Sequence, residues 1–125
     1  MERHEKLWES AQEDSVWSIL LRDNQVITCC EDKSVRVLAL QSGEELHRLE
    51  HPSPCNSADL SPNKKILAVA CDSAVVLWDF KKAVKIEQFD LGTEESQVID
   101  VRFNPTGDKV IAGLCEGEVF VIELK

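Results

Sequence analysis

Short apolar stretches separated by polar turns recur three times along this chain. In the last copy, residues 98–103 alternate apolar and polar side chains, residues 104–107 form a polar turn, and residues 109–113 return. A second turn over residues 115–117 leads to a closing stretch over 119–124. Alternation with period 2 between turn residues predicts β-strands, so each copy is expected to be an antiparallel meander.

The repeat has a period close to 40 residues. The corresponding positions Val35, Val75 and Val119 are 40 and 44 residues apart, and no amphipathic helix intervenes. That period with strands only is typical of the four-stranded blades of a β-propeller. We therefore predict an all-β fold of three antiparallel four-stranded blades forming part of a propeller. The single domain, 1–125, divides into repeats over 15–50, 55–91 and 97–125.

Three sequence motifs resemble the WD-repeat family. Trp78-Asp79 is similar to its WD dipeptide, and the turns beginning at Leu60-Ser61-Pro62-Asn63 and Phe103-Asn104-Pro105 are similar to its strand and turn signature. Leu38-Ala39 and Ile122-Glu123 stand where the other two copies would carry Trp-Asp. The chain thus resembles three divergent WD repeats of a partial propeller, which implies a non-enzymatic scaffold for protein complexes.

The resemblance also implies a buried hydrogen-bond network in each blade. In the middle blade it maps onto His51, Asp72 and Trp78, next to Asp79, while Val69 takes the place of a Ser or Thr. In the first blade it maps onto Thr28 and Asp32, but Leu38 lacks the indole N–H that would complete the network.

A WD repeat usually begins with the outer strand of the preceding blade, so residues 5–10 are predicted to be an outer strand completing another blade. Three blades are too few for a closed ring. We expect the chain to be a portion or isoform of a longer propeller, to form a six-bladed ring from two copies, or to assemble with blades of a different partial propeller.

Composition indicates where in the cell the protein is located and which kinds of partner it binds. No apolar run approaches the roughly 20 residues that span a bilayer, and the first residues lack a secretory signal. The five cysteines include no C-x-x-C pair and are expected to be reduced thiols. We therefore expect a cytoplasmic or nuclear protein. The net charge of −9 argues against nucleic-acid binding.

No common catalytic or nucleotide-binding motif is present, and the three histidines, His4, His47 and His51, lack the spacing of a metal site. We expect no enzymatic activity and no cofactor or metal. His51 is better explained as the structural histidine of the repeat.

Assigning the turns by repeat position predicts an acidic face. The second turn of each meander and the loops that follow outer strands should share one end of the blades. Together they carry Glu13, Asp14, Glu31, Asp32, Asp72, Glu94, Glu95 and Glu116, against Lys33. The opposite face should be mixed to basic, with Arg22, Lys64, Lys65, Lys81, Lys82 and Lys109.

Such a face suits basic protein or peptide segments, since charge complementarity steers partners. The candidate partner-binding residues are Glu13, Asp14, Trp17, Glu31, Glu94, Glu95 and Glu116. Two alternatives stay open: the charges only solvate the surface, or the chain is a structural fragment that completes or competes with a full propeller.

Overall fold

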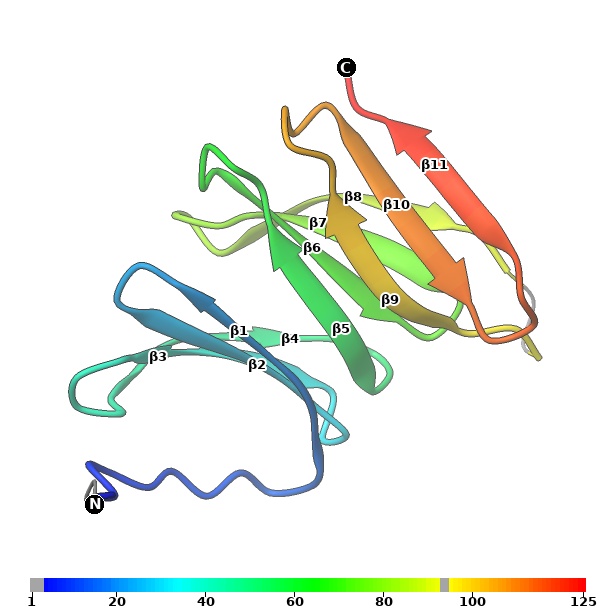
Figure 1. The fold of residues 1–125 in the computed structure, drawn as a ribbon. Helices are drawn as coiled ribbons and strands as arrows, with labels where there is room; N and C mark the ends of the chain where they lie inside the picture. The colour runs from blue at the N-terminus through cyan, green and yellow to red at the C-terminus, as the bar shows by residue number, and fades with distance from the viewer. Residues whose placement is uncertain (1–3, 93–94) are drawn as a thin grey trace.

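The computed structural model describes residues 4–92 and 95–125, and within them the chain forms eleven strands and no helix. The strands make three antiparallel sheets that follow one another as a fan from the N-terminal to the C-terminal end (Figure 1). The predicted all-β fold of antiparallel blades is confirmed.

Each sheet is a meander of consecutive strands, and we call the sheets blades one, two and three. Blade one contains β1 (Val16–Arg22), β2 (Gln25–Cys30), β3 (Ser34–Ala39) and β4 (Glu45–Glu50). Blade two contains β5 (Cys55–Leu60), β6 (Ile66–Cys71), β7 (Ala74–Asp79) and β8 (Val84–Asp90). Blade three contains β9 (Val98–Phe103), β10 (Lys109–Leu114) and β11 (Val119–Glu123).

Blade three contains the three strands predicted near residues 98–103, 109–113 and 119–124 and lacks a fourth strand among the described residues. Its order is β11-β10-β9, whereas the other two blades each have a fourth, outer strand. The outer edge of β11 stays unpaired because no other segment of the described residues runs beside it.

Asparagine side chains fix the first turns of blades two and three. The Asn63 Oδ1 accepts a hydrogen bond from the backbone N–H of Lys65 at 3.0 Å, and the Asn104 Oδ1 accepts one from Lys109 at 2.9 Å. Short Asn side chains favour turns by this local bonding. These turns therefore define where β5 and β9 end.

The hydrophobic core lies between the blades, in two layers. Ile27 and Val35 of blade one pack with Leu67 and Val69 of blade two, and all four are fully buried. The second layer joins blades two and three and contains Ala68, Ala70, Val75, Val101 and Val110. Alternation puts neighbouring residues of β6 on opposite layers, so both faces of blade two are buried.

The segment before β1 corrects one prediction. Residues 5–10 form no strand. The indole of Trp8 donates a hydrogen bond to the carbonyl of Leu40 at 2.7 Å, and the Gln12 amide donates one to Thr28 Oγ1 at 2.8 Å. These side-chain hydrogen bonds, rather than backbone pairing, hold the segment in place. The segment lies across the face of blade one that points away from blade two, and we call residues 5–10 the strap (Figure 1).

Candidate interaction face

Backbone hydrogen bonds bring the loops before the innermost strands against the second turn of each meander. The N–H of Glu31 donates to the Ser15 carbonyl at 2.8 Å, and that of Cys115 donates to Gln97 at 2.9 Å. Between blades, the N–H of Val98 donates to the Asp72 carbonyl at 2.8 Å. These loops therefore share one end of the blades, which we call the acidic face.

The acidic face has a hollow at the junction of blades one and two. Glu31 from the turn after β2 and Asp72 from the turn after β6 line it. Its other lining residues are Ser53, Pro54, Asn56 and Gln97. Two carboxylates from different blades thus border one small depression whose remaining wall carries no charge.

Four other predicted acidic residues lie in loops at the same end of the blades. Glu13 and Asp14 are exposed in the loop joined to Glu31, and Glu95 and Glu116 are exposed in the corresponding loops of blade three. Glu94 lies outside the described residues. The side chains of the face are solvated, and so they are available to a partner.

Trp17 stands at the edge of the acidic face. Its side chain is 57% exposed, and its indole N–H donates a hydrogen bond to the Glu31 carboxylate at 2.9 Å. An exposed indole with one polar anchor offers an apolar surface of fixed orientation beside the carboxylates. Aromatic residues of this kind are common anchors in protein interfaces.

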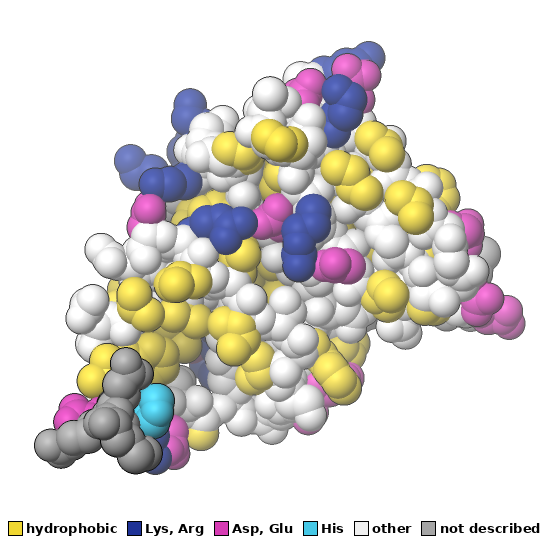
Figure 2. Space-filling model, viewed as in Figure 1, with side chains coloured by type: hydrophobic (Ala, Val, Ile, Leu, Met, Phe, Trp, Pro, Cys, Tyr) yellow, Lys and Arg dark blue, Asp and Glu magenta, His cyan; other side chains and the backbone are white. Residues whose placement is uncertain are grey.

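The opposite end of the blades is mixed to basic. A shallow hollow there is lined by Asn63, Lys64, Lys65, Asp79, Lys81 and Lys82. Figure 2 shows lysine and arginine side chains gathering along the upper and left edges of the molecule, with carboxylates at the right edge. Arg22 and Lys109 are paired there with Asp59 and Asp108.

His51 and Trp78 form the hydrogen bond that the family resemblance implies. The Trp78 indole donates to His51 Nε2 at 3.0 Å, and His51 Nδ1 lies 3.1 Å from the Leu49 carbonyl. These contacts fit a neutral imidazole with its proton on Nδ1. Burial lowers the pKa of His51 to about 4, so the ring stays neutral near pH 7.

Asp72 does not join this network, which corrects the prediction. Its side chain is exposed in a two-residue turn at φ 54°, and it makes no hydrogen bond to any described residue. The turn is too short to aim the carboxylate back at His51. Asp79 instead stabilises the next turn, where its Oδ1 accepts a hydrogen bond from the Lys82 N–H at 2.9 Å.

Thr28 and Asp32 of blade one lie in separate contacts. Thr28 receives the hydrogen bond from Gln12, while Asp32 forms a buried ion pair with Arg36 at 2.7 Å and accepts hydrogen bonds from Ser34. Burial raises the pKa of Asp32, but its hydrogen bonds outweigh burial and hold the pKa at about 2. Asp32 is therefore a structural residue and contributes little to the exposed acidic face.

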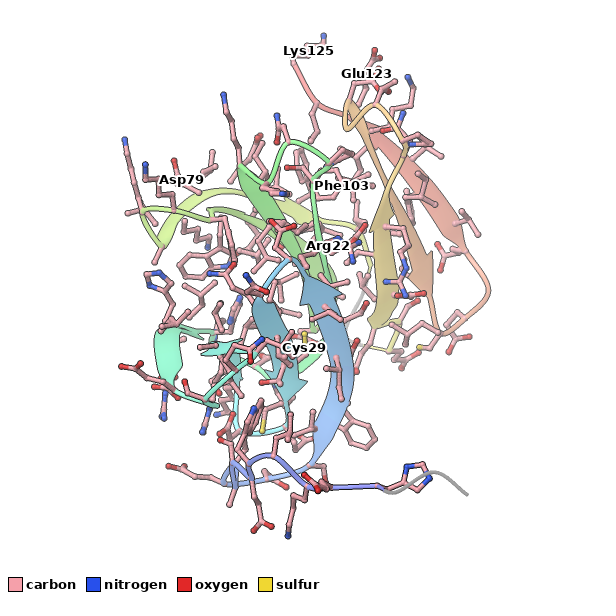
Figure 3. All side chains as sticks on the ribbon, turned by 60° about the vertical axis from the view of Figure 1, so that its left-hand side comes forward. Arg22, Cys29, Asp79, Phe103, Glu123 and Lys125 are labelled. Carbon is pink, nitrogen blue, oxygen red and sulfur yellow. The ribbon has the colours of Figure 1, made fainter. Side chains whose placement is uncertain are left out.

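Sequence reasoning missed Asp59, which links all three blades. It is buried on β5 and accepts hydrogen bonds from Arg22 at 2.8 Å and from the Phe103 N–H at 2.8 Å. Figure 3 shows Arg22 and Phe103 near each other. The sequence feature that could have indicated this role is one acidic residue between apolar residues of a strand, in Ala58-Asp59-Leu60.

Among residues 4–92 and 95–125, no three His, Cys, Asp or Glu side chains are grouped as a metal site would require. In the same ranges no helix has the length and apolar character needed to cross a membrane.

The fold and the loop-built face define the class: these are blades of a β-propeller. The family model for "WD domain, G-beta repeat" matches residues 43–79, which run from the turn before β4 to the end of β7. The resemblance of the chain to the WD-repeat β-propeller family is thereby confirmed, and the match falls on the blade that carries the His51–Trp78 pair.

One curated relative is a zebrafish (Danio rerio) protein, "Activating molecule in BECN1-regulated autophagy protein 1A". It is 28% identical over 85 residues, which cover 68% of this chain and 6% of the relative. The chain therefore corresponds to a small part of that protein's length.

Two solved structures share the fold. The WD40 β-propeller domain of Doa1 superimposes with a TM-score of 0.82 at 19% identity, covering 91% of this chain and 38% of that one. The computationally designed Ika4 protein superimposes with a TM-score of 0.78 at 25% identity, covering 91% of this chain and 69% of that one. WD40 propeller domains generally mediate protein–protein interactions and are generally non-enzymatic scaffolds.

Proposed function

We propose that this protein is an interaction scaffold whose acidic face binds basic segments of partner proteins. The observation that carries the proposal is the hollow between blades one and two, where Glu31 and Asp72 face the same depression. Two carboxylates from separate blades provide two acceptor sites for the guanidinium or ammonium groups of an extended peptide.

The surroundings of the hollow support a peptide ligand. Trp17 is held by Glu31 beside it and supplies apolar surface for the methylene groups of Lys or Arg. Glu13, Asp14, Glu95 and Glu116 add negative charge in loops at the same end of the blades. Charge of one sign over a face increases the association rate with oppositely charged partners.

Titration of the 125-residue chain with a peptide that alternates arginine and serine tests this proposal. We expect saturable binding that weakens as salt is added, and no binding to the corresponding glutamate and serine peptide. The double variant E31Q/D72N should lower the affinity about fivefold, since two charge pairs at partly exposed sites together contribute about 1 kcal/mol.

The substitutions are chosen to preserve the structure. Gln at position 31 keeps an oxygen acceptor for Trp17, and Asn at position 72 tolerates the left-handed backbone of that turn. The matched control is E44Q/E87Q, which removes the same net charge from exposed positions outside the acidic face. Equal affinity of both double variants for the peptide would overturn the proposal and leave the charges as a solvated surface.

A second candidate function is supported by blade three. Val119 and Val121 on β11 are 70% and 61% exposed. Apolar side chains on a blade face are suited to packing against another blade, either from a second copy of this chain or from another propeller. Light scattering of the chain at rising concentration tests self-association, and V119K/V121K should abolish any dimer.

The proposed location is the cytoplasm or the nucleus. All five cysteines are free thiols, and four of them are buried. Free thiols are usual where the cellular environment is reducing. Imaging of a tagged chain in cells tests this location.

A further inference from the structure

We propose that Cys55 and Cys71 form a reversible dithiol–disulfide pair that hydroperoxides oxidise. The two residues are direct partners across the antiparallel β5–β6 ladder. Partners in such a ladder have Cα atoms about 4.5 to 5.5 Å apart, which lies inside the range that a disulfide spans. A β-bulge shifts the register between Cys55 and Ser57, so the positions of the two sulfur atoms decide whether the thiols can join.

The two sulfur atoms converge on one backbone oxygen. Cys71 Sγ lies 3.3 Å and Cys55 Sγ 3.8 Å from the Ser53 carbonyl, which accepts a hydrogen bond from each thiol. Two thiols that share one acceptor lie on the same side of the sheet and point toward the same spot. This is the orientation that a cross-strand disulfide requires.

Only one of the two thiols has a route to solvent. Cys71 lines a hollow of about 140 Å³, together with His51, Ser53 and Lys85. Cys55 is fully buried and does not line it. A small peroxide entering this hollow meets Cys71 first, so Cys71 is the residue attacked by the oxidant and Cys55 is the residue that resolves the product.

The electrostatic setting agrees with these roles. When Cys71 is a thiolate, the Cys55 S–H turns from the Ser53 carbonyl to the Cys71 sulfur, and this hydrogen bond lowers the pKa of Cys71. Burial and Asp72 raise that pKa and the Lys85 ammonium lowers it, and the net direction is down. The same hydrogen bond, together with burial, raises the pKa of Cys55. The thiolate is the nucleophile in thiol oxidation, which favours the first reaction at Cys71.

The other cysteines lack this arrangement. Cys29 faces Val35 and Ser18 in its ladders, and Cys30 faces Val16. Burial raises the pKa of Cys29 to about 12. Cys115 is exposed, but its position in the turn after β10 gives it no cysteine partner.

The chemistry balances in two steps. The Cys71 thiolate attacks one oxygen of the hydroperoxide, the O–O bond breaks, and a sulfenic acid forms as the other oxygen leaves and takes a proton. The Cys55 sulfur then attacks the Cys71 sulfur, the S–O bond breaks and water leaves with the Cys55 proton. The two thiols lose two electrons to the peroxide, and a later thiol reductant restores them.

Oxidation would act on the acidic face through Ser53. A disulfide removes both thiol donors from the Ser53 carbonyl, and Ser53 lines the hollow that holds Glu31 and Asp72. This consequence rests on the proposed function, whereas formation of the disulfide does not.

The experiment treats the native 125-residue chain with hydrogen peroxide, blocks free thiols with N-ethylmaleimide and maps the peptides by mass spectrometry. We expect a Cys55–Cys71 linked peptide that disappears after treatment with a reductant. A linkage that involves Cys29 or Cys30, or oxidation of Cys115 alone, would overturn the proposal.

Two single variants, in which the disulfide cannot form, show which cysteine the peroxide attacks first. C55S should leave Cys71 as a sulfenic acid that dimedone labels, while C71S should show no dimedone label at Cys55. C115S is the matched control, because it removes an exposed thiol and should keep the linked peptide. Circular dichroism confirms the fold of each variant, and equal labelling of Cys55 and Cys71 would contradict the assigned order.

Discussion

Arg22 and Asp59 form an ion pair across two blades, with Arg22 Nη2 2.8 Å from Asp59 Oδ1. Arg22 ends β1 of blade one, and Asp59 lies on β5 of blade two. The second carboxylate oxygen accepts a hydrogen bond from the backbone N–H of Phe103 in blade three. One buried carboxylate therefore fixes how the three innermost strands sit beside one another.

Replacement of Asp59 should destabilise the chain more than replacement of Arg22. In D59A the Phe103 N–H loses its acceptor inside the protein, and we expect a cost of about 2 to 3 kcal/mol. R22A should cost less, about 1 to 2 kcal/mol, because Asp59 keeps the hydrogen bond from the Phe103 N–H and the Arg22 side chain is already 40% exposed, although the buried carboxylate loses its counter-charge. Urea unfolding followed by circular dichroism gives both values, and equal costs would contradict a bridging role for Asp59.

Stability should fall as the pH is lowered from about 6.5 to about 4. Burial lowers the pKa of folded His51 to about 4, below the ordinary histidine pKa of 6.5, so the unfolded chain binds the proton first. The stabilisation is present above pH 6.5 and is lost as the pH falls through 4, up to about 3 kcal/mol. Urea unfolding at several pH values measures it.

The H51Q variant is the control for this loss, since it has no group at position 51 that titrates in that window. A second loss is expected at lower pH from Asp32. Its folded pKa of about 2 is below the ordinary aspartate pKa of 3.8, so its contribution is lost as the pH falls through 2. An H51Q curve that keeps the full drop between pH 6.5 and 4 would refute the assignment to His51.

Replacement of Gly43 should disturb the packing of the strap, because Trp8 of the strap lies against this glycine. It adopts φ +77°, and a Cβ there would lie 2.6 Å from the Trp8 ring. G43A should therefore displace Trp8 and shift its fluorescence to longer wavelength. G117A is the matched control, because Gly117 also has positive φ, +97°, but nothing lies within 4 Å of its Cβ position.

Both glycine variants should lose about 1 kcal/mol from backbone strain. Only G43A should also expose the strap, which limited proteolysis after Lys6 detects. Similar fluorescence and proteolysis of the two variants would show that Trp8 is not seated on Gly43.

The architecture was accessible from sequence because strand alternation and turn residues are local signals. The turns at Asn63 and Asn104 and the three meanders follow from residues near each other in the sequence. The pairing of His51 with Trp78 follows from the resemblance to the repeat family. The repeat pattern also predicted which loops share an end of the blades, and that grouping defines the acidic face.

The features that the sequence did not predict depend mainly on contacts between separate segments of the chain. The strap over residues 5–10 takes its anchors from Leu40 and Thr28, which no local pattern reveals. The bridge through Asp59 depends on how far each blade rotates relative to the next. Asp72 lies in a turn of two residues between strands, shorter than the corresponding turns of blades one and three, and its carboxylate is exposed.

Nuclear magnetic resonance mapping of the arginine and serine peptide on the chain shows which loops the peptide contacts. We expect the amide shift changes to concentrate in the loops of the acidic face, around residues 13–17, 31–32, 53–56, 72–73 and 95–97, with the Trp17 indole N–H among them. Shift changes concentrated instead in the turns near residues 22–24, 63–65 and 80–83 would contradict binding at the acidic face.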